Sequence, residues 1–307
     1  MPTVSIIIPT HSRPHLLPDA VQSAFAAGTD LEVVVVDDAS TDQTAAVCSS
    51  LNGIRYVRLD QNEGVAGARN AGIAASSADY IALLDDDDIR LAGSIDLQLA
   101  ALQKSDAALI YGQAMFGGAT DHLTYDRYPL RSPSGDVFWQ LLTQNFIPSG
   151  SVIVRRSCLM SAGLFDPSLA GIDDWDLWIR LAAEYPVAAV DQPVIVWRRP
   201  SPASDQGSAK AVEMVARSTR QFRRYWIKMS RIAAMEPARK QKVARQFSEN
   251  MASHLVNEAV RSIHYGKLLS ANRCVLAALR YHPYGLFSRM ARELSMRTRT
   301  QSLRSTS

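Results

Sequence analysis

The sequence has little cysteine and no long hydrophobic run. Its three cysteines, Cys48, Cys158 and Cys274, are odd in number and far apart, which excludes a disulfide framework and a CxxC zinc site. The apolar run near the N-terminus, Val4–Ile8, is too short for the core of a signal peptide. No stretch approaches the roughly 20 consecutive apolar residues of a membrane-spanning helix. We therefore expect a protein of the reducing cytoplasm.

Positive charge is scarce in the first two thirds of the chain, and negative charge is scarce in the last third. Residues 1–204 hold 13 basic and 24 acidic side chains, giving −11, whereas residues 205–307 hold 20 basic and 6 acidic side chains, giving +14. The 307 residues are 47% hydrophobic and have a net charge of +3, which is enough apolar material for a sizeable core. We predict two domains, 1–204 and 205–307, with different partners.

Short apolar runs alternate with helix-length segments over the first 115 residues. This pattern predicts strands at Val4–Ile8, Leu31–Val36, Ile54–Leu59, Tyr80–Leu84 and Ala107–Tyr111, and helices near residues 16–27, 43–50, 66–76 and 91–103. Strands that are apolar on both faces and alternate with helices form a parallel sheet covered on both sides. The predicted fold class is therefore α/β, with a mostly parallel, doubly wound sheet.

The remainder of the chain is mixed and then helical. A strand is predicted at Ser151–Val154, a helix at Asp173–Glu184, and one or two strands within Val187–Trp197. A segment rich in proline, serine and glycine follows at 199–207, which is typical of a boundary. Helices are predicted near residues 210–234, 238–264, 267–281 and 285–298.

Four consecutive aspartates, Asp85–Asp88, follow the fourth predicted strand. Ligands of open parallel sheets bind beyond the carboxyl ends of the strands. Two carboxylates about 4 Å apart repel by roughly 4 kcal/mol at an effective dielectric near 20, which a bound cation would relieve. Carboxylate oxygens suit Mg²⁺ or Mn²⁺. The run predicts a divalent-metal site, and the alternative is a solvated acidic turn that caps the next helix.

Two further segments carry candidate site residues. Asn62–Gly72 is a glycine-containing loop that enters a predicted helix and holds Arg69, so it suits either phosphate contact or close helix packing. It matches neither GxGxxG nor GxxxxGK[ST], which argues against a dinucleotide-binding dehydrogenase and a P-loop phosphotransferase. Asp173 and Asp174 follow Gly171 at a predicted helix start. They either complement the helix dipole or include a general base.

Taken together, these motifs resemble the family-2 glycosyltransferases of the GT-A fold. The resemblance covers about residues 3–200 and rests on five motifs in a fixed order: Val4–Thr10, Val35–Asp42, Asn62–Ile73, Leu84–Asp88 and Asp173–Trp178. It implies an inverting transferase that takes a sugar from a nucleoside diphosphate and uses Mn²⁺ or Mg²⁺.

The resemblance also implies roles for residues of this chain. The residues implied to bind the donor or acceptor are Pro9, Thr10, His11, Arg13, Asp38, Gly64, Arg69, Asp86, Asp173 and Trp175. Asp85 and Asp87 are implied as the metal ligands, and Asp174 as the catalytic base.

The chain departs from the family pattern late in the domain. Family members often have a histidine there that can complete the metal shell, whereas this chain reads Trp197-Arg198-Arg199-Pro200. The Gln-x-x-Arg-Trp signature and the membrane spans of processive synthases are also missing, which favours addition of a single sugar.

The resulting hypothesis is an enzyme of bacterial surface or extracellular glycan synthesis. It would move one sugar, from UDP in preference to dTDP or GDP, to a hydroxyl of a glycan or lipid-linked acceptor. Two alternatives remain: a non-catalytic nucleotide-sugar-binding protein of the same fold, and a metal-dependent nucleotidyltransferase.

The basic C-terminal region suggests a second partner. Cationic helices bind anionic lipid surfaces, so residues 205–307 are predicted to hold the protein peripherally on the inner face of a membrane. The alternative is a solvated face of a helical appendage docked on the acidic domain. Nucleic acid also attracts positive charge, but the region has no nucleic-acid-binding motif and no such partner is expected.

Overall fold

A computed structural model describes residues 2–117, 123–198 and 210–281. The chain divides into two compact units: a first unit of Met1–Leu141 and Asn145–Arg199, and a second unit of Leu142–Gln144 and Pro200–Ser307. The predicted domain boundary at residue 204 lies outside the described residues.

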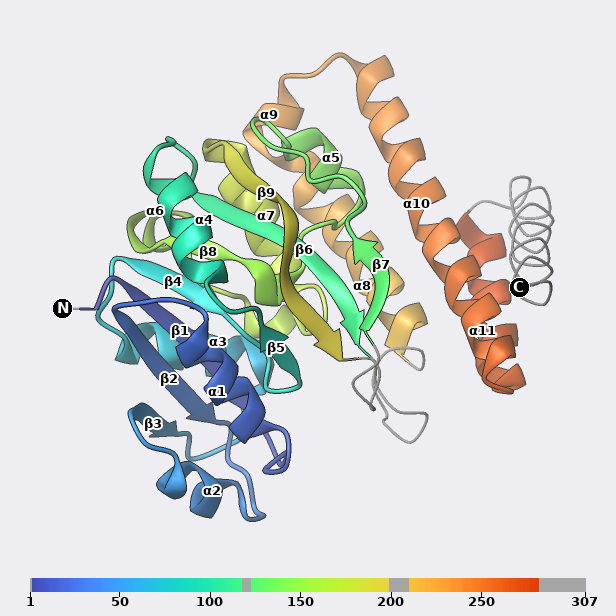
Figure 1. Cartoon of the computed structure of the whole chain (residues 1–307). Helices are drawn as coiled ribbons and strands as arrows, with labels where there is room; N and C mark the ends of the chain where they lie inside the picture. The colour runs from blue at the N-terminus through green and yellow to red at the C-terminus, as the bar shows by residue number, and fades with distance from the viewer. Residues whose placement is uncertain (1, 118–122, 199–209, 282–307) are drawn as a thin grey trace, which may run out of the picture. The chain divides into compact units, whose positions relative to one another are not determined.

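The first half of the sheet is parallel. Strands β1 (Val4–Thr10), β2 (Leu31–Asp37), β3 (Ile54–Arg58) and β4 (Tyr80–Leu83) lie in the order β3-β2-β1-β4 (Figure 1). All seven residues of β1 are buried, as its unbroken apolar run predicts for a strand covered on both faces.

Helices cover both faces of this half. One face packs its alternate residues, Ile6 and Val35 among them, against α1 (Leu17–Ala26), α2 (Thr44–Ser50) and α4 (Ser94–Gln103). The other face, which includes Ile7 and Val36, receives α3 (Gly64–Ala75). The predicted doubly wound arrangement is confirmed.

The second half of the sheet mixes strand directions. The order continues from β4 through β8 (Ile153–Arg155), β6 (Leu109–Gly117) and β9 (Val187–Arg198) to β5 (Asp88–Arg90), and β7 (Leu123–Tyr128) pairs with β6. β6 and β9 are parallel, whereas β8 is antiparallel to β4 and β6, and β5 is antiparallel to β9. The antiparallel pairs and the strands β5 and β7 were not predicted.

A short connection forces this sheet to curl. Only the four residues Leu84–Asp87 join β4 to β5, and a chain of that length spans roughly 17 Å at most between Leu83 and Asp88. In a flat sheet the four strand spacings between β4 and β5 would measure about 19 Å. The far edge of the sheet therefore bends back toward the end of β4, and the aspartate run spans the gap.

Short helices join the later strands. They are α5 (Phe138–Thr143), the 3₁₀ helix η1 (Ser149–Ser151), α6 (Arg156–Ala162), the 3₁₀ helix η2 (Pro167–Leu169) and α7 (Asp173–Glu184). Helix α7 has the predicted bounds. α5 and α6 were not predicted, because six or seven residues are too few for a periodic apolar pattern.

The second unit is helical in its described part. Its elements are α8 (Ala211–Arg224), η4 (Trp226–Lys228), α9 (Ser230–Ala233), α10 (Pro237–His264) and α11 (Leu268–Tyr281). The predicted helix 210–234 is wrong as a single element, because the chain breaks around Tyr225 and Met229. The predicted helix 285–298 lies outside the described residues.

Aromatic stacking builds the core of this unit. The rings of Phe222 and Phe247 stack 4.2 Å apart, and the ring of Trp226 meets Phe247 edge-on at 6.5 Å. Helices α10 and α11 pack together as a hairpin. None of the helices in the described ranges has the length and apolar character needed to cross a bilayer.

The contact of α3 with the sheet leads to a first prediction. A Cβ atom at Gly72 would collide with Ile7 Cγ2 and lie 2.9 Å from Val36 Cγ2. Overpacking of this kind costs about 1–3 kcal/mol, and the better helix propensity of alanine returns about 1 kcal/mol. We expect Gly72→Ala to lower the free energy of unfolding by up to about 2 kcal/mol, measured by denaturant titration.

The control is Ala74→Ser at an exposed position of the same helix, which should cost only about 0.5 kcal/mol. A Gly72→Ala protein as stable as the parent would contradict the close approach.

Candidate active site

The carboxyl ends of the parallel strands bring the predicted donor residues to one edge. The hydroxyl of Thr10, at the end of β1, donates to Asp86 Oδ2 over 2.6 Å, and both residues are buried. Asp38 follows β2, and its backbone N–H donates to the carbonyl of Thr10 over 2.9 Å. The sheet thus places the aspartate run beside the loop that follows β1.

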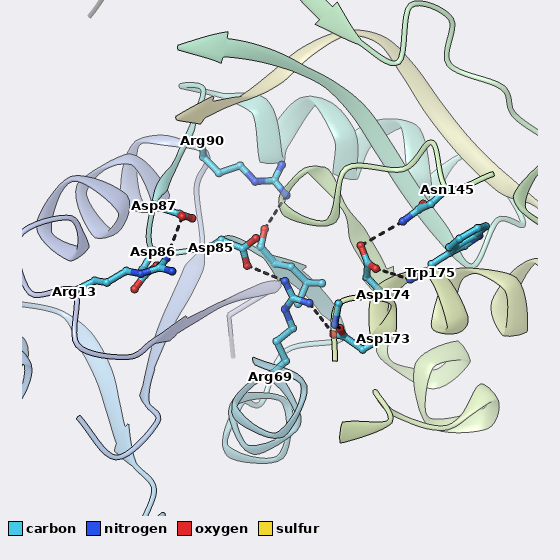
Figure 2. A network of polar contacts seen from close by, with 12 residues as sticks. Arg13, Arg69, Asp85, Asp86, Asp87, Arg90, Asn145, Asp173, Asp174 and Trp175 are labelled. Carbon is cyan, nitrogen blue, oxygen red and sulfur yellow. Dashed lines mark hydrogen bonds and ion pairs between the residues drawn. The ribbon is translucent and has the colours of Figure 1, made fainter. Parts of the chain in front are cut away.

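Arg13 ties two of the aspartates together. Its Nη1 lies 3.0 Å from Asp86 Oδ1 and 3.0 Å from Asp87 Oδ2, as Figure 2 shows. Burial raises the pKa of Asp86 to about 6, although the hydrogen bond from Thr10 and the charge of Arg13 act in the opposite direction.

The loop after β2 forms a polar corner with the loop before α3. His11 Nδ1 lies 2.7 Å from the carbonyl oxygen of Asp38 and 3.3 Å from Asn62 Nδ2. Asp38 Oδ1 accepts the N–H of Glu63 over 2.7 Å. Asn62 Nδ2 reaches the Asp38 carbonyl at 3.5 Å. Gly64 begins α3 with φ +73°, a conformation that favours glycine.

Pro9 completes the group of predicted residues at this end of the sheet. It lies in β1 opposite Val36 and is buried. Contact of Pro9 with the donor stays a prediction.

Arg69 links the aspartate run to a second acidic pair. Helix α3 places it 4% exposed, with Nη2 2.7 Å from Asp85 Oδ1 and Nη1 3.2 Å from Asp173 Oδ2 (Figure 2). Its guanidinium carbon lies 5.3 Å from the centre of the Phe165 ring. Arg69 Nε is buried and has no hydrogen-bond partner among the described residues.

Asp173 and Asp174 open α7 but have different neighbours. Asp173 Oδ1 accepts the N–H of Gly171 over 3.1 Å, in addition to the ion pair of Oδ2 with Arg69. Asp174 Oδ1 accepts the N–H of Trp175 over 2.6 Å, whereas among the described residues Oδ2 has only the amide of Asn145 at 3.4 Å. Burial, and then the charge of Asp173, raise the pKa of Asp174 to about 7, a value suited to a general base at neutral pH.

Trp175 anchors the start of α7. It is buried, and its indole N–H donates to the carbonyl oxygen of Leu141 over 2.6 Å. This contact fixes the helix start that carries the acidic pair. Contact of Trp175 with substrate stays a prediction.

Three carboxylates offer a place for a divalent ion. Oxygens of Asp85, Asp87 and Asp88 all lie within 4.8 Å of one another, and such hard oxygen donors fit Mg²⁺ or Mn²⁺. Asp88 was not predicted as a ligand. It begins β5, is buried, and its Oδ1 accepts the N–H of Arg198 over 3.2 Å.

Two arginines, Arg198 and Arg199, stand where family members often have the late histidine, and only the first is among the described residues. Arg198 Nη2 lies 3.3 Å from Asp19 Oδ2 of α1, so this side chain has an acidic partner within the first unit. Arg199 is not among the described residues.

Sequence reasoning did not identify Asn62, Asn145 and Asp88 as site residues. Asn62 was inside a recognised segment, so its polar side chain at a strand end gave some signal. Asn145 gave none, because it lies 29 positions before Asp174 in a loop. Asp88 was recognised as part of the aspartate run, but it was not identified as a possible metal ligand.

Comparison with known proteins identifies the family. Residues 5–160 match the family described as "Glycosyl transferase family 2", and the chain belongs to this family. The family resemblance seen in the sequence is thereby confirmed.

Curated relatives bear similar descriptions. "Uncharacterized glycosyltransferase YwdF" of Bacillus subtilis (strain 168) is 28% identical over 226 residues, which are 70% of this chain and 79% of YwdF. An "Uncharacterized glycosyltransferase" of Rickettsia felis is 28% identical over 194 residues, 62% of this chain and 32% of that protein. The chain therefore spans about a third of the length of the Rickettsia felis relative.

A more local match and a solved structure complete the comparison. The "Succinoglycan biosynthesis protein ExoO" of Rhizobium meliloti is 41% identical over 91 residues, 29% of this chain and 26% of ExoO. The crystal structure of S. aureus TarS 1–349 in complex with UDP-GlcNAc has a TM-score of 0.54 at 13% identity, covering 91% of this chain and 92% of that chain. At this identity the likeness shows the fold alone.

The Arg69 link leads to a second prediction. Removing one partner of a buried ion pair leaves an uncompensated charge and costs about 3–5 kcal/mol. We expect Arg69→Met to lower the free energy of unfolding by this amount, and Asp173→Asn in the same chain to restore part of it. A double-mutant cycle by denaturant titration measures the coupling.

The matched control is Arg55→Met, which removes the surface pair with Glu32 at 3.4 Å and should cost at most about 1 kcal/mol. Additive effects of the Arg69 and Asp173 substitutions would contradict the coupling.

Proposed function

We propose that this protein transfers a single sugar from a nucleoside-diphosphate sugar to an acceptor hydroxyl, with inversion at the anomeric carbon. The observation that carries the proposal is that Arg69 joins Asp173, the immediate neighbour of the candidate base Asp174, to Asp85 of the aspartate run. Asp174 is itself outside this ion-pair network, but the charges of Arg69 and Asp85 act on its carboxylate, so the candidate base and the candidate metal site belong to one region of the structure.

The donor side is proposed to be the edge formed by the ends of β1, β2 and β4. Family membership supports it, and Thr10, His11, Arg13, Asp38 and Asp86 form one set of polar contacts there. UDP is the proposed nucleotide, because the related fold of TarS was solved with UDP and with UDP-GlcNAc.

The acceptor is proposed to be a surface glycan or its lipid-linked precursor. The description of ExoO as a succinoglycan biosynthesis protein supports this class. We further propose that the protein works on the inner face of the membrane, held there through its basic C-terminal helices.

The chemistry follows from the contrast between the two adjacent acids. Asp173 has both oxygens engaged, by Gly171 N–H and by Arg69, so its role is to position Arg69. In the part of the chain that the structure describes, Asp174 Oδ2 has one long contact, from Asn145, and it is the oxygen proposed to take the proton. As the acceptor hydroxyl loses its proton to Asp174, its oxygen bonds to the anomeric carbon, and the bond from that carbon to the diphosphate breaks.

The departing diphosphate carries negative charge that the chain must stabilise. Arg13, which is bonded to Asp86 and Asp87, is the cation proposed to lie nearest to it. A divalent ion held by Asp85 and Asp87, with Asp88 beside them, would supply further positive charge to the leaving group. Orientation and electrostatics thus account for most of the proposed catalysis.

The base assignment leads to a third prediction. Asp174→Asn keeps the shape of the side chain but cannot accept the proton, so we expect transfer to fall about 10²–10⁴-fold while UDP affinity stays nearly unchanged. The measurement is sugar transfer from UDP-sugars to a panel of glycan and lipid-linked acceptors, with UDP titration as the binding readout. Glu184→Gln, an exposed carboxylate at the other end of α7, is the control.

The pH profile gives the same test a second readout. Only the ionised form of Asp174 accepts a proton, and its pKa is raised to about 7, so kcat should fall as the pH drops below about 7. Near-parental transfer by Asp174→Asn would refute the base assignment. UDP binding without transfer by the parent would instead favour a non-catalytic sugar-nucleotide-binding protein.

The aspartate run leads to a fourth prediction. Asp87→Asn removes one carboxylate charge from the candidate metal site, and we expect it to weaken Mn²⁺ binding at least tenfold in calorimetry or Mn²⁺ EPR titration. Asp79→Asn, exposed at the opposite end of β4, should leave Mn²⁺ binding unchanged. Equal Mn²⁺ affinities for the parent and Asp87→Asn would favour the solvated acidic turn.

A further inference from the structure

Large apolar side chains lie in solvent where α10 turns into α11. Of the exposed large hydrophobic residues in the described part of the chain, five fall within this 14-residue stretch: Ile263, Tyr265, Leu268, Leu269 and Leu276. Leu269 is 84% exposed and Leu268 is 67% exposed. Single exposed leucines are ordinary, but several large apolar residues exposed on one helical hairpin indicate an interaction site. We call these five residues, with the cations among them, the hairpin surface.

The two faces of α11 differ in their packing. Ala271, Cys274 and Ala278 are buried on its inner face, and the helix packs against α10 and α8. Leu269 and Leu276 lie two turns apart on the opposite face. The inner residues account for the packing of α11 in its unit, so the outward leucines add nothing to that core.

Cations alternate with these leucines. Arg273 and Arg280 each lie one helical turn after Leu269 and Leu276, so leucine and arginine form one stripe along α11. Lys267 precedes the two leucines at the turn. All three cations are exposed, and none of them has an ion pair within the described part of the chain.

Acidic residues are scarce along the sequence of the hairpin, and the one that lies near it, Glu258 of α10, already has an arginine partner. The sequence from Ala259 to Tyr281 contains four arginine or lysine residues and no aspartate or glutamate. Arg261, the fourth cation, is paired with Glu258 at 2.7 Å. The remaining three positive charges therefore attract an anionic partner.

We propose that the hairpin surface binds an anionic lipid bilayer peripherally. The leucines and Ile263 enter the boundary between headgroups and acyl chains, Tyr265 lies at headgroup level, and the three cations contact lipid phosphates. Long arginine stems suit this arrangement, because they lie along apolar surface while the guanidinium reaches the headgroups. The phosphates of a nucleic acid would also pair with the three cations, but a nucleic acid offers no apolar environment for the two leucines at the tip of the hairpin.

This inference rests on and deepens the membrane part of the proposed function, because it names the surface that contacts the lipid, but it is independent of the proposed transfer reaction. Lipid binding needs neither a donor nor a divalent ion, so its test remains valid if the protein transfers no sugar. A bound bilayer would also concentrate the chain where lipid-linked acceptors reside.

Flotation of the full chain with vesicles tests the proposal. Vesicles of phosphatidylcholine alone are compared with vesicles that also contain phosphatidylglycerol, each at low and high salt. We expect flotation with the anionic vesicles only, weakened by salt because lipid charge is screened. Failure to float with anionic vesicles at low salt, or equal flotation with both vesicle types, would overturn the proposal.

Paired substitutions locate the surface. Leu268→Asp with Leu269→Asp, and separately Arg273→Ala with Arg280→Ala, should each weaken binding to the anionic vesicles about tenfold or more. Leu130→Asp is the matched control, because Leu130 is also 84% exposed but belongs to the first unit. Circular dichroism checks that each variant is folded.

Light scattering identifies a competing occupant. If the parent is a dimer and the leucine variant a monomer, a second copy of the chain covers the surface and the bilayer proposal is wrong. If both leucine and arginine variants float like the parent, the surface is likewise excluded as the site of lipid contact.

Discussion

The geometry of the acidic edge depends on a buried positive charge that closes the curled sheet. Arg90 is 2% exposed, and burial lowers its pKa to about 9, so it still carries its charge at neutral pH. Its guanidinium bonds Gln98 Oε1 at 2.6 Å and the carbonyls of Val152 and Leu83 at 3.0 and 3.5 Å. These contacts tie β5 to the end of β4. Asp85, Asp86 and Asp87 lie in the connection between those two strands. The hydrogen bonds of Arg90 therefore limit how far apart the carboxylates of these aspartates can lie.

Two further arginines distribute the remaining charge. Arg13 bridges Asp86 and Asp87, and Arg69 bridges Asp85 and Asp173, so two guanidiniums face four carboxylates. The site keeps an excess of negative charge, because each guanidinium carries one positive charge and contacts two carboxylates. That excess gives a divalent cation a reason to bind, and it opposes ionisation of further acids nearby. Arg90, Arg13 and Arg69 thus assemble the carboxylates without neutralising them.

The parallel half of the fold could be predicted from the sequence, because long apolar runs and helix-length spacings specify strands covered on both faces. The bounds of α7 followed from its acidic start and apolar stripe. β5 could not be predicted, since it is three residues long and begins with the last aspartate of the run. Arg90 was missed for a related reason: a charged residue in a short polar segment is usually exposed, and its burial depends on the closing of the sheet. Asn145 depends on a contact between distant loops, which periodicity does not encode.

Asp173 and Asp174 look equivalent in the sequence, but their contacts in the structure give them different properties. Both are aspartates in the first turn of α7, where a helix dipole favours negative charge equally. The difference comes from Arg69, which forms an ion pair with Asp173 but not with Asp174. Desolvation acts on both, and Asp174 also experiences the charge of Asp173. The ion pair therefore suits Asp173 to holding Arg69 in place, whereas burial and the charge of Asp173 raise the pKa of Asp174, which is the property that a general base requires.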